Sequence, residues 1–167
     1  YRRLFNGYAM PLAFVDLDLL GENAQEIARR ANGKRIRIAT KSVRCVTVLK
    51  RILEHSSSFQ GLMSYSAAEA VFLSQHGFDD ILVAYPTWNE LQIKRVCEEV
   101  SSGKSIVLMV DSVDHVLRLD AVAARHGTTL PICLDVDLSM DLPGLHFGVW
   151  RSPVSSVESA LSVFRAV

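Results

Sequence analysis

A lysine at the end of a short β-branched run is the residue whose type and position point most directly to chemistry. Residues 35–44 read Arg-Ile-Arg-Ile-Ala-Thr-Lys-Ser-Val-Arg, and Lys41 follows the expected strand 36–40. Active sites of α/β folds lie at the carboxyl ends of parallel strands, where a lysine amine can form a Schiff base with a carbonyl compound or an aldehyde cofactor. The alternative is a lysine that closes a strand and reaches into water, because lysine side chains are seldom buried.

Other polar side chains are expected at the ends of the neighbouring strands. They are Asp16 and Asp18 after the first strand, Thr40 after the second, Ser64 and Tyr65 after the third, Tyr85 after the fourth, Asp111 after the fifth, and Asp135 and Asp137 after the sixth. In a parallel barrel they would meet at one rim, with one lysine among carboxylates and phenols. Helix capping is the alternative for Asp18, Ser66, Thr87 and Ser112, but it does not explain Tyr85.

The elements that must position these side chains alternate between apolar strands and amphipathic helices. Strands are predicted at residues 12–17, 36–40, 60–64, 81–85, 105–110 and 132–136. Helices are predicted at residues 19–31, 43–54, 66–75, 88–101, 112–125 and 154–165, and residues 137–152 are expected to be irregular. The strands begin about every 24 residues, and such a series of βαβ units predicts a parallel sheet with right-handed crossovers.

Two α/β architectures are compatible with this series, an open doubly wound sheet or part of an eight-stranded barrel. The uniform period favours the barrel, and the continuous apolar strands suit a sheet that is covered on both faces. A closed barrel needs eight strands, and six are predicted here. The fold class is therefore expected to be α/β, a parallel βαβ repeat forming six of the eight strands of a TIM-type barrel, with residues 1–167 as the amino-terminal portion of that domain.

Composition excludes several classes of partner. The 167 residues are 49% hydrophobic, and Lys+Arg and Asp+Glu balance at 18 each, so nothing favours nucleic acid or an anionic membrane. No apolar run is long enough to span a bilayer and no signal peptide opens the chain, which makes the cytoplasm the expected location. Cys45, Cys97 and Cys133 are far apart and odd in number, which favours reduced, buried thiols over disulfides or a zinc site.

Sequence motifs of other enzyme classes are absent. The chain has no dinucleotide-binding G-x-G-x-x-G after the first strand, no Walker phosphate loop and no G-x-S-x-G nucleophile elbow. The histidines lack metal-ligand spacing, so no metal site is expected in these residues. Four of them, His55, His76, His115 and His126, are expected to be solvated on helices, whereas His146 lies in the loop after the sixth strand.

Several stretches together resemble one family of pyridoxal-phosphate enzymes. Residues 11–18 read Pro-Leu-Ala-Phe-Val-Asp-Leu-Asp, and Asn23 and then Ile-Arg-Ile-Ala-Thr-Lys-Ser follow. Together with residues 80–86, 134–137 and 146–148, they are similar to the alanine-racemase-type (fold type III) barrels. The similarity is greater to the branch that contains D-threonine aldolases and D-serine dehydratases, and it extends over essentially the whole chain.

The resemblance implies a cofactor site. In that family the lysine that closes the second strand carries pyridoxal phosphate as a Schiff base, and Lys41 matches that position. Asp16, Tyr85 and His146 are the other candidate cofactor-binding residues. In racemases the corresponding loop often offers an arginine near the cofactor ring. Here the matching position is His146, and the role of the arginine is therefore not carried over. The family's phosphate loops, and in this branch the ligands of a divalent metal, belong to a carboxy-terminal part that these 167 residues lack.

The resemblance therefore implies a parent enzyme that acts on a small amino acid, as an aldolase, a deaminase or dehydratase, or a racemase. The 167 residues alone are expected to be inactive. A non-catalytic pyridoxal-phosphate homeostasis protein is the alternative, although it would need a complete barrel, and an unrelated α/β domain is the third possibility. The incomplete sheet would leave open edges at its first and sixth strands, which predicts a homo-oligomer or edges covered by terminal segments.

Overall fold

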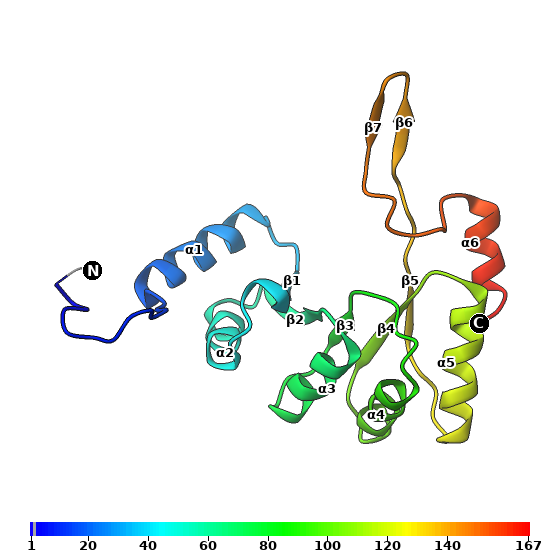
Figure 1. Cartoon of the computed structure of the whole chain (residues 1–167), viewed down its shortest axis with the longest axis horizontal. Coiled ribbons are helices and arrows are strands. Elements are labelled where there is room, and N and C mark those ends of the chain that lie inside the picture. The colour runs from blue at the N-terminus through cyan, green and yellow to red at the C-terminus, as the bar shows by residue number, and fades with distance from the viewer. Residues whose placement is uncertain (2) are drawn as a thin grey trace.

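The computed structural model describes residues 1 and 3–167, and these residues build one five-stranded parallel sheet (Figure 1). Its strands are β1 (Ile36–Ala39), β2 (Phe59–Ser64), β3 (Ile81–Val83), β4 (Ile106–Val110) and β5 (Ile132–Leu134). Each strand pairs with the next one in the sequence, so the order across the sheet is β1-β2-β3-β4-β5. The α/β class and the parallel repeat expected from the sequence are confirmed.

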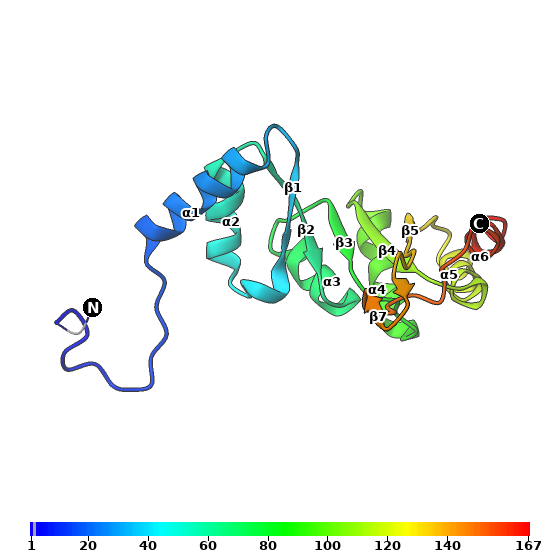
Figure 2. The same cartoon turned by 90° about the horizontal axis from the view of Figure 1, so that it is seen from above.

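A helix connects most consecutive strands. The helices are α1 (Leu17–Arg30), α2 (Val46–His55), α3 (Ala67–Gln75), α4 (Glu90–Ser101), α5 (Val113–Arg125) and α6 (Val157–Phe164). α1 packs against α2, and α3, α4, α5 and α6 each pack against the next in that series; Figures 1 and 2 show the helices following one another along the sheet. A doubly wound sheet reverses its strand order and uses both faces, whereas this sheet does neither, so the arrangement is that of a partial barrel. Within the described residues, no helix is long and apolar enough to cross a membrane.

The first expected strand, residues 12–17, does not form. Residues 12–16 pair with no strand, and α1 already begins at Leu17. The Phe14 ring packs instead within its own segment, with its centroid 4.6 Å from Phe5 and 4.9 Å from Tyr1. This segment lies away from the sheet (Figure 2), so the described sheet has five of the six expected strands and β1 is an edge strand.

Residues 137–152 are more ordered than the sequence predicted. They contain an antiparallel hairpin of β6 (Met140–Leu142) and β7 (Leu145–Phe147), which stands away from the sheet beyond the end of β5 (Figure 1). Strands of three residues are too short to show an alternating pattern, which is why this hairpin was not predicted.

The base of the hairpin is held by a serine and an aspartate. The Asp137 carboxylate accepts a hydrogen bond from the Ser139 backbone N–H at 2.7 Å, and the Ser139 hydroxyl oxygen accepts from the N–H groups of Val149 and Trp150. Hydrogen bonds from the side chain and backbone of Ser139 hold the pKa of Asp137 below its usual value. The ionised carboxylate therefore stabilises the hairpin base.

The core lies between the sheet and its helices. Leu62, Ile81 and Ile106 form one row across β2, β3 and β4, and none of them is exposed to solvent. Ile93 and Val96 of α4 belong to the same core cluster. The sheet is therefore most deeply buried at its centre, which fixes the positions of the strand ends that carry the polar residues.

A polar link joins β1, β2 and the start of β3. The Arg37 guanidinium donates to the backbone carbonyl of Asp80 at 2.5 Å, to its carboxylate at 2.8 Å and to the Leu62 carbonyl at 3.2 Å. Gly61 lies directly beneath, with φ +72°, and a Cβ atom there would come within 2.5 Å of the Asp80 carbonyl oxygen. Both the backbone angle and the space therefore call for glycine.

Candidate active site

Lys41 lies where the sequence predicted, at the carboxyl end of a parallel strand. β1 ends at Ala39, and a short 3₁₀ turn, η1 (Thr40–Ser42), begins at once. The Lys41 side chain is exposed, and its Nζ atom lies 5.7 Å from the centroid of the Tyr65 ring. Among the residues that the structure describes, it has no ion-pair partner. The amine is thus available to react at the rim of the sheet.

Three further side chains continue from Lys41 along the rim. Tyr65 follows β2 and Tyr85 follows β3, and their ring centroids lie 5.1 Å apart at an interplanar angle of 60°. The guanidinium carbon of Arg151 lies 4.6 Å from the centroid of the Tyr85 ring. We call these four side chains the rim row. A cation stands over an aromatic face at each end of it, and such contacts are favourable because the ring face carries negative charge.

Arg151 comes from the segment after β7 and reaches across three strand ends. Its Nε atom donates to the Asp135 carboxylate at 3.2 Å, and one terminal nitrogen donates to the Ala84 carbonyl and lies 3.6 Å from the Met109 sulfur. The Ser152 hydroxyl donates to the Asp135 carbonyl at 2.7 Å, which fixes the backbone beside Arg151. Arg151 was not among the residues predicted from the sequence, although its place in the loop after the last strand of the sheet was a signal for it.

The structure brings Tyr85 into the rim row, but it does not bring Asp16 or His146 to Lys41. Asp16 caps α1, accepting from the N–H groups of residues 18 and 19, and also accepts from the Tyr1 hydroxyl. The bonds from Tyr1 and then from the backbone of Leu19 lower the pKa of Asp16. A cofactor role for Asp16 stays a prediction.

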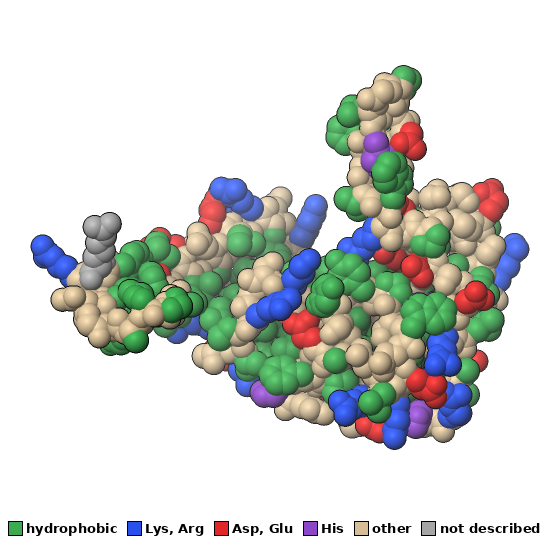
Figure 3. Space-filling view, in the orientation of Figure 1, with side chains coloured by type: hydrophobic (Ala, Val, Ile, Leu, Met, Phe, Trp, Pro, Cys, Tyr) green, Lys and Arg blue, Asp and Glu red, His purple; other side chains and the backbone are tan. Residues whose placement is uncertain are grey.

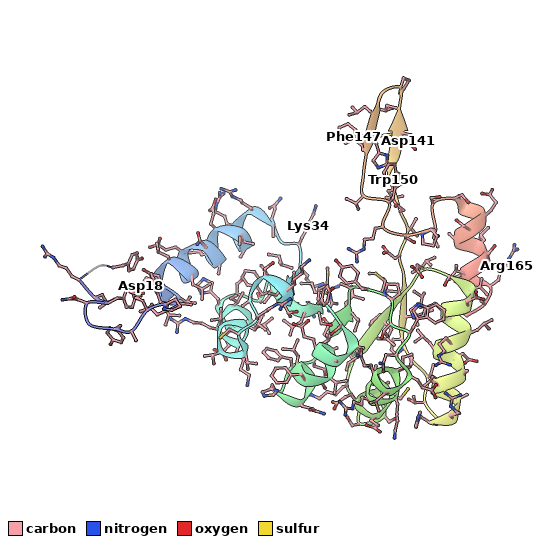
Figure 4. All side chains as sticks on the ribbon, viewed as in Figure 1. Asp18, Lys34, Asp141, Phe147, Trp150 and Arg165 are labelled. Atoms are coloured by element: carbon pink, nitrogen blue, oxygen red, sulfur yellow. The ribbon has the colours of Figure 1, made fainter. Side chains whose placement is uncertain are left out.

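His146 belongs to the hairpin. Its Nδ1 atom lies 2.7 Å from the Asp141 carboxylate, and its ring stacks on Trp150 with centroids 3.6 Å apart. Figure 4 shows Asp141, Phe147 and Trp150 together on the hairpin, away from the helices, and Figure 3 shows how far this hairpin stands from the body. A cofactor role for His146 likewise stays a prediction.

Two hollows flank the ring of Tyr65. One, of about 400 Å³, lies between α2 and α3 and is bordered by Arg44 and Glu69. The other, of about 320 Å³, lies between Tyr65, Tyr85 and Trp88 at the rim. An exposed amine beside aromatic walls suits the aldehyde and the flat ring of pyridoxal phosphate. No group of three or more His, Cys, Asp or Glu side chains gathers as a metal site in the described part of the chain.

Two expectations about single residues need correction. His115 was expected to be solvated, but it is fully buried; its Nε2 atom lies 2.8 Å from the Thr87 carbonyl oxygen, and its ring stacks on Trp88. His115 lies on the same buried face of α5 as Leu119, so the helical spacing of these two residues was the signal that His115 would be buried. All three cysteines are free thiols, as expected, but Cys45 is exposed.

The sequence matches a known protein family over most of its length. Residues 15–162 match the family described as alanine racemase, N-terminal domain. The chain is 27% identical over 158 residues to a 3-hydroxy-D-aspartate aldolase of Paracoccus denitrificans, which covers 93% of this chain and 38% of the relative.

Solved structures of two enzymes share the fold. A D-threonine aldolase from Filomicrobium marinum has a TM-score of 0.75 at 19% identity, over 95% of this chain and 40% of that one. A D-threo-3-hydroxyaspartate dehydratase from Delftia sp. HT23 has a TM-score of 0.79 at 22% identity, over 96% of this chain and 40% of that one. The chain thus spans about two fifths of the length of these relatives.

Proposed function

Because the chain belongs to the alanine racemase N-terminal domain family, we propose that it is part of a pyridoxal-phosphate-dependent enzyme that acts on an amino acid. Lys41 is the residue that binds the cofactor covalently. The observation that carries this proposal is the exposed amine of Lys41 at the carboxyl end of β1, beside the ring of Tyr65 and without an ion-pair partner among the described residues.

The bound cofactor supplies an electron-accepting ring that stabilises negative charge on the α-carbon of an amino acid. Lys41 would hold the cofactor by its amine, through the cofactor's aldehyde. When it is not bonded to the cofactor, the same amine would be able to accept or return a proton. Arg151 is proposed to lie near the ring, because one of its terminal nitrogens has no hydrogen bond among the described residues and Tyr85 supports its guanidinium.

The names of the relatives favour a lyase. The similar proteins are named for aldol cleavage of 3-hydroxy-D-aspartate and of D-threonine, and for dehydration of D-threo-3-hydroxyaspartate. We therefore propose a small 3-hydroxy amino acid of D configuration as the substrate, with cleavage or dehydration as the reaction. Racemisation and non-catalytic cofactor binding are the alternatives, and the 167 residues alone are proposed to be inactive. The proposed location is the cytoplasm.

Any divalent metal is proposed to bind outside these residues. One related dehydratase is described in a metal-free form, which indicates that a metal belongs to that protein. The residues described for this chain offer no cluster of three ligands for it. The phosphate-binding loops are likewise proposed to lie outside these residues, in a region that corresponds to the part of the relatives that this chain does not span.

A homo-oligomer is proposed because apolar and edge surfaces lack cover. β1 has one unpaired edge, and on the hairpin the side chains of Leu138 and Val149 are 88% and 78% exposed. Exposed edges and apolar patches favour association. Sedimentation of the 167-residue chain is expected to show a dimer or larger species, and a compact monomer would contradict this.

The Lys41 assignment is tested by trapping in the full-length protein that contains this chain. Borohydride reduction of the cofactor-loaded protein is expected to leave a stable adduct that peptide mass spectrometry maps to Lys41. Lys41→Ala should lose both the adduct and the visible absorbance of the cofactor. Lys34→Ala, which removes an exposed lysine before β1, should keep both. An adduct on another lysine would refute the assignment.

A further inference from the structure

The carboxylate of Glu69 joins Thr40, the residue before Lys41, to Tyr65, whose ring lies near the Lys41 amine. Glu69 lies in the first turn of α3 and is half-buried. Its Oε1 atom accepts a hydrogen bond from the Thr40 hydroxyl at 2.9 Å, and its Oε2 atom accepts from the Tyr65 backbone N–H at 2.7 Å. Both oxygens of Glu69 are therefore used to hold the surroundings of Lys41.

Helix capping alone does not explain this arrangement. Ser66 caps α3, and its hydroxyl oxygen accepts from the Glu69 backbone N–H at 3.2 Å. In a capping box the glutamate side chain returns to the backbone N–H of the capping residue itself. Here the carboxylate reaches one residue further back, to Tyr65, and also across to Thr40 at the end of β1. The second contact joins two parts of the fold and adds nothing to the cap.

Thr40 transmits this contact to the lysine. It is fully buried, and its hydroxyl oxygen lies 2.9 Å from Glu69 and 3.2 Å from the Met63 carbonyl. A hydroxyl has one proton, and the bond to the carboxylate is the shorter and the charge-assisted one. The Thr40 carbonyl in turn accepts the N–H groups of Val43 and Arg44, which closes the turn around Lys41. Fixing Thr40 therefore fixes the direction in which the lysine leaves the strand.

We propose that Glu69 is a positioning residue that sets the place of the Lys41 amine at the rim, acting through Thr40 and Tyr65. This inference rests on the proposed function, because it assumes that Lys41 binds the cofactor aldehyde. A lysine side chain has many rotamers, and holding a reactive group near its target accelerates bond formation. Glu69 is therefore expected to affect how fast the cofactor attaches, without touching the cofactor.

Two pairs of variants isolate the effect in the full-length apoprotein. Glu69→Ala and Thr40→Val each remove the bond between Glu69 and Thr40, whereas Thr40→Ser keeps a hydroxyl. Glu99→Gln is the matched control, because Glu99 also accepts two side-chain bonds, from Ser74 and Gln75, at the other end of α3. Circular dichroism and a melting curve establish that each variant is folded before it is compared.

The readout is the rate at which pyridoxal phosphate attaches, followed by its visible absorbance and by reductive trapping. Glu69→Ala and Thr40→Val are expected to slow attachment about tenfold, while Thr40→Ser and Glu99→Gln stay within about twofold of the parent. Formaldehyde is a small aldehyde that reacts with an exposed amine without requiring the amine to point in a fixed direction. The extent of reductive methylation at Lys41 should therefore be the same in all variants.

The outcomes separate this inference from the function on which it rests. If the parent adduct forms on Lys41 and Glu69→Ala attaches the cofactor at the parent rate, the positioning role is refuted and the proposed function stands. Equal slowing by Glu69→Ala and Glu99→Gln would also refute the positioning role, because the effect would then be general. An adduct on another lysine refutes both proposals.

Discussion

Replacing Gly61 by alanine is expected to destabilise the sheet by about 3 kcal/mol, for two separate reasons. Gly61 has φ +72°, a left-handed backbone angle that disfavours any side chain. In addition, the new Cβ would lie 2.5 Å from the Asp80 carbonyl oxygen and 2.6 Å from a terminal nitrogen of Arg37. A long side chain can move aside, but the backbone carbonyl of Asp80 cannot move without disturbing β3.

The magnitude follows from these two parts. The left-handed angle costs about 1–2 kcal/mol, and the smaller freedom of alanine in the unfolded chain returns about 0.4–1 kcal/mol. A hydrogen bond from a charged group contributes about 1.5–3 kcal/mol, and the lower half of this range applies because the Arg37 and Asp80 side chains are 31% and 40% exposed. The angle therefore accounts for about 1 kcal/mol, and the close approach for about 2 kcal/mol.

Gly77→Ala is the control for the backbone angle. Gly77 has φ +89°, but nothing lies within 4 Å of the position of its Cβ. Urea unfolding of both variants by far-ultraviolet circular dichroism should place the midpoint of Gly61→Ala about 1 M below that of Gly77→Ala, for a slope of about 2 kcal/mol/M. Equal midpoints would show that Arg37 and Asp80 do not close over Gly61.

Three further predictions concern other parts of the molecule. His115→Ala should lower the free energy of unfolding by about 2–4 kcal/mol in urea titrations, because it empties a buried site. If His115→Phe loses less stability than His115→Ala, the filled volume matters more than the hydrogen bond to Thr87. The lowered pKa of Asp137 means that its stabilisation of the hairpin base is present above the ordinary value of 3.8 and is lost as the pH falls through the folded-state pKa. Trp150 fluorescence should follow this loss, and Asp137→Asn should abolish the transition. Cys45 should react with a thiol reagent in the native protein, whereas Cys97, which is buried and has a pKa raised by burial, should react only on unfolding; equal rates would contradict this.

The strands and helices could largely be predicted because their signals are local. Ser66 and Ser112 cap α3 and α5 as expected, and the apolar runs of β2 and β4 lie within a residue of their predicted positions. Residues 12–17 have the same local pattern, but a strand also needs a paired neighbour, which no local pattern specifies. In the structure, the aromatic contacts of Phe14 and the cap made by Asp16 prevail.

The candidate site could be predicted only where it depends on strand ends. Lys41 and Tyr85 follow strands, so their shared rim follows from the order of the elements. Arg151 depends on how a loop folds back, which is fixed by the Ser152 hydroxyl and by the burial of Val154. Such tertiary contacts leave no periodic signal in the sequence, which is why Arg151 was not among the residues predicted from it.

The sequential order of the sheet also has a consequence for local unfolding. Within the part of the chain that the structure describes, each strand of the sheet pairs only with its neighbours in sequence, so the sheet behaves like a linear array of repeats whose ends can open without the centre. Amide hydrogens of β3, which lies at the centre of the sheet, should exchange most slowly, and those of β1 and β5, at its two edges, most rapidly. Lys41 directly follows β1, so the amine proposed to bind the cofactor is attached to a strand that opens readily. Any segment that pairs with the free edge of β1 would slow exchange there and hold the lysine more firmly.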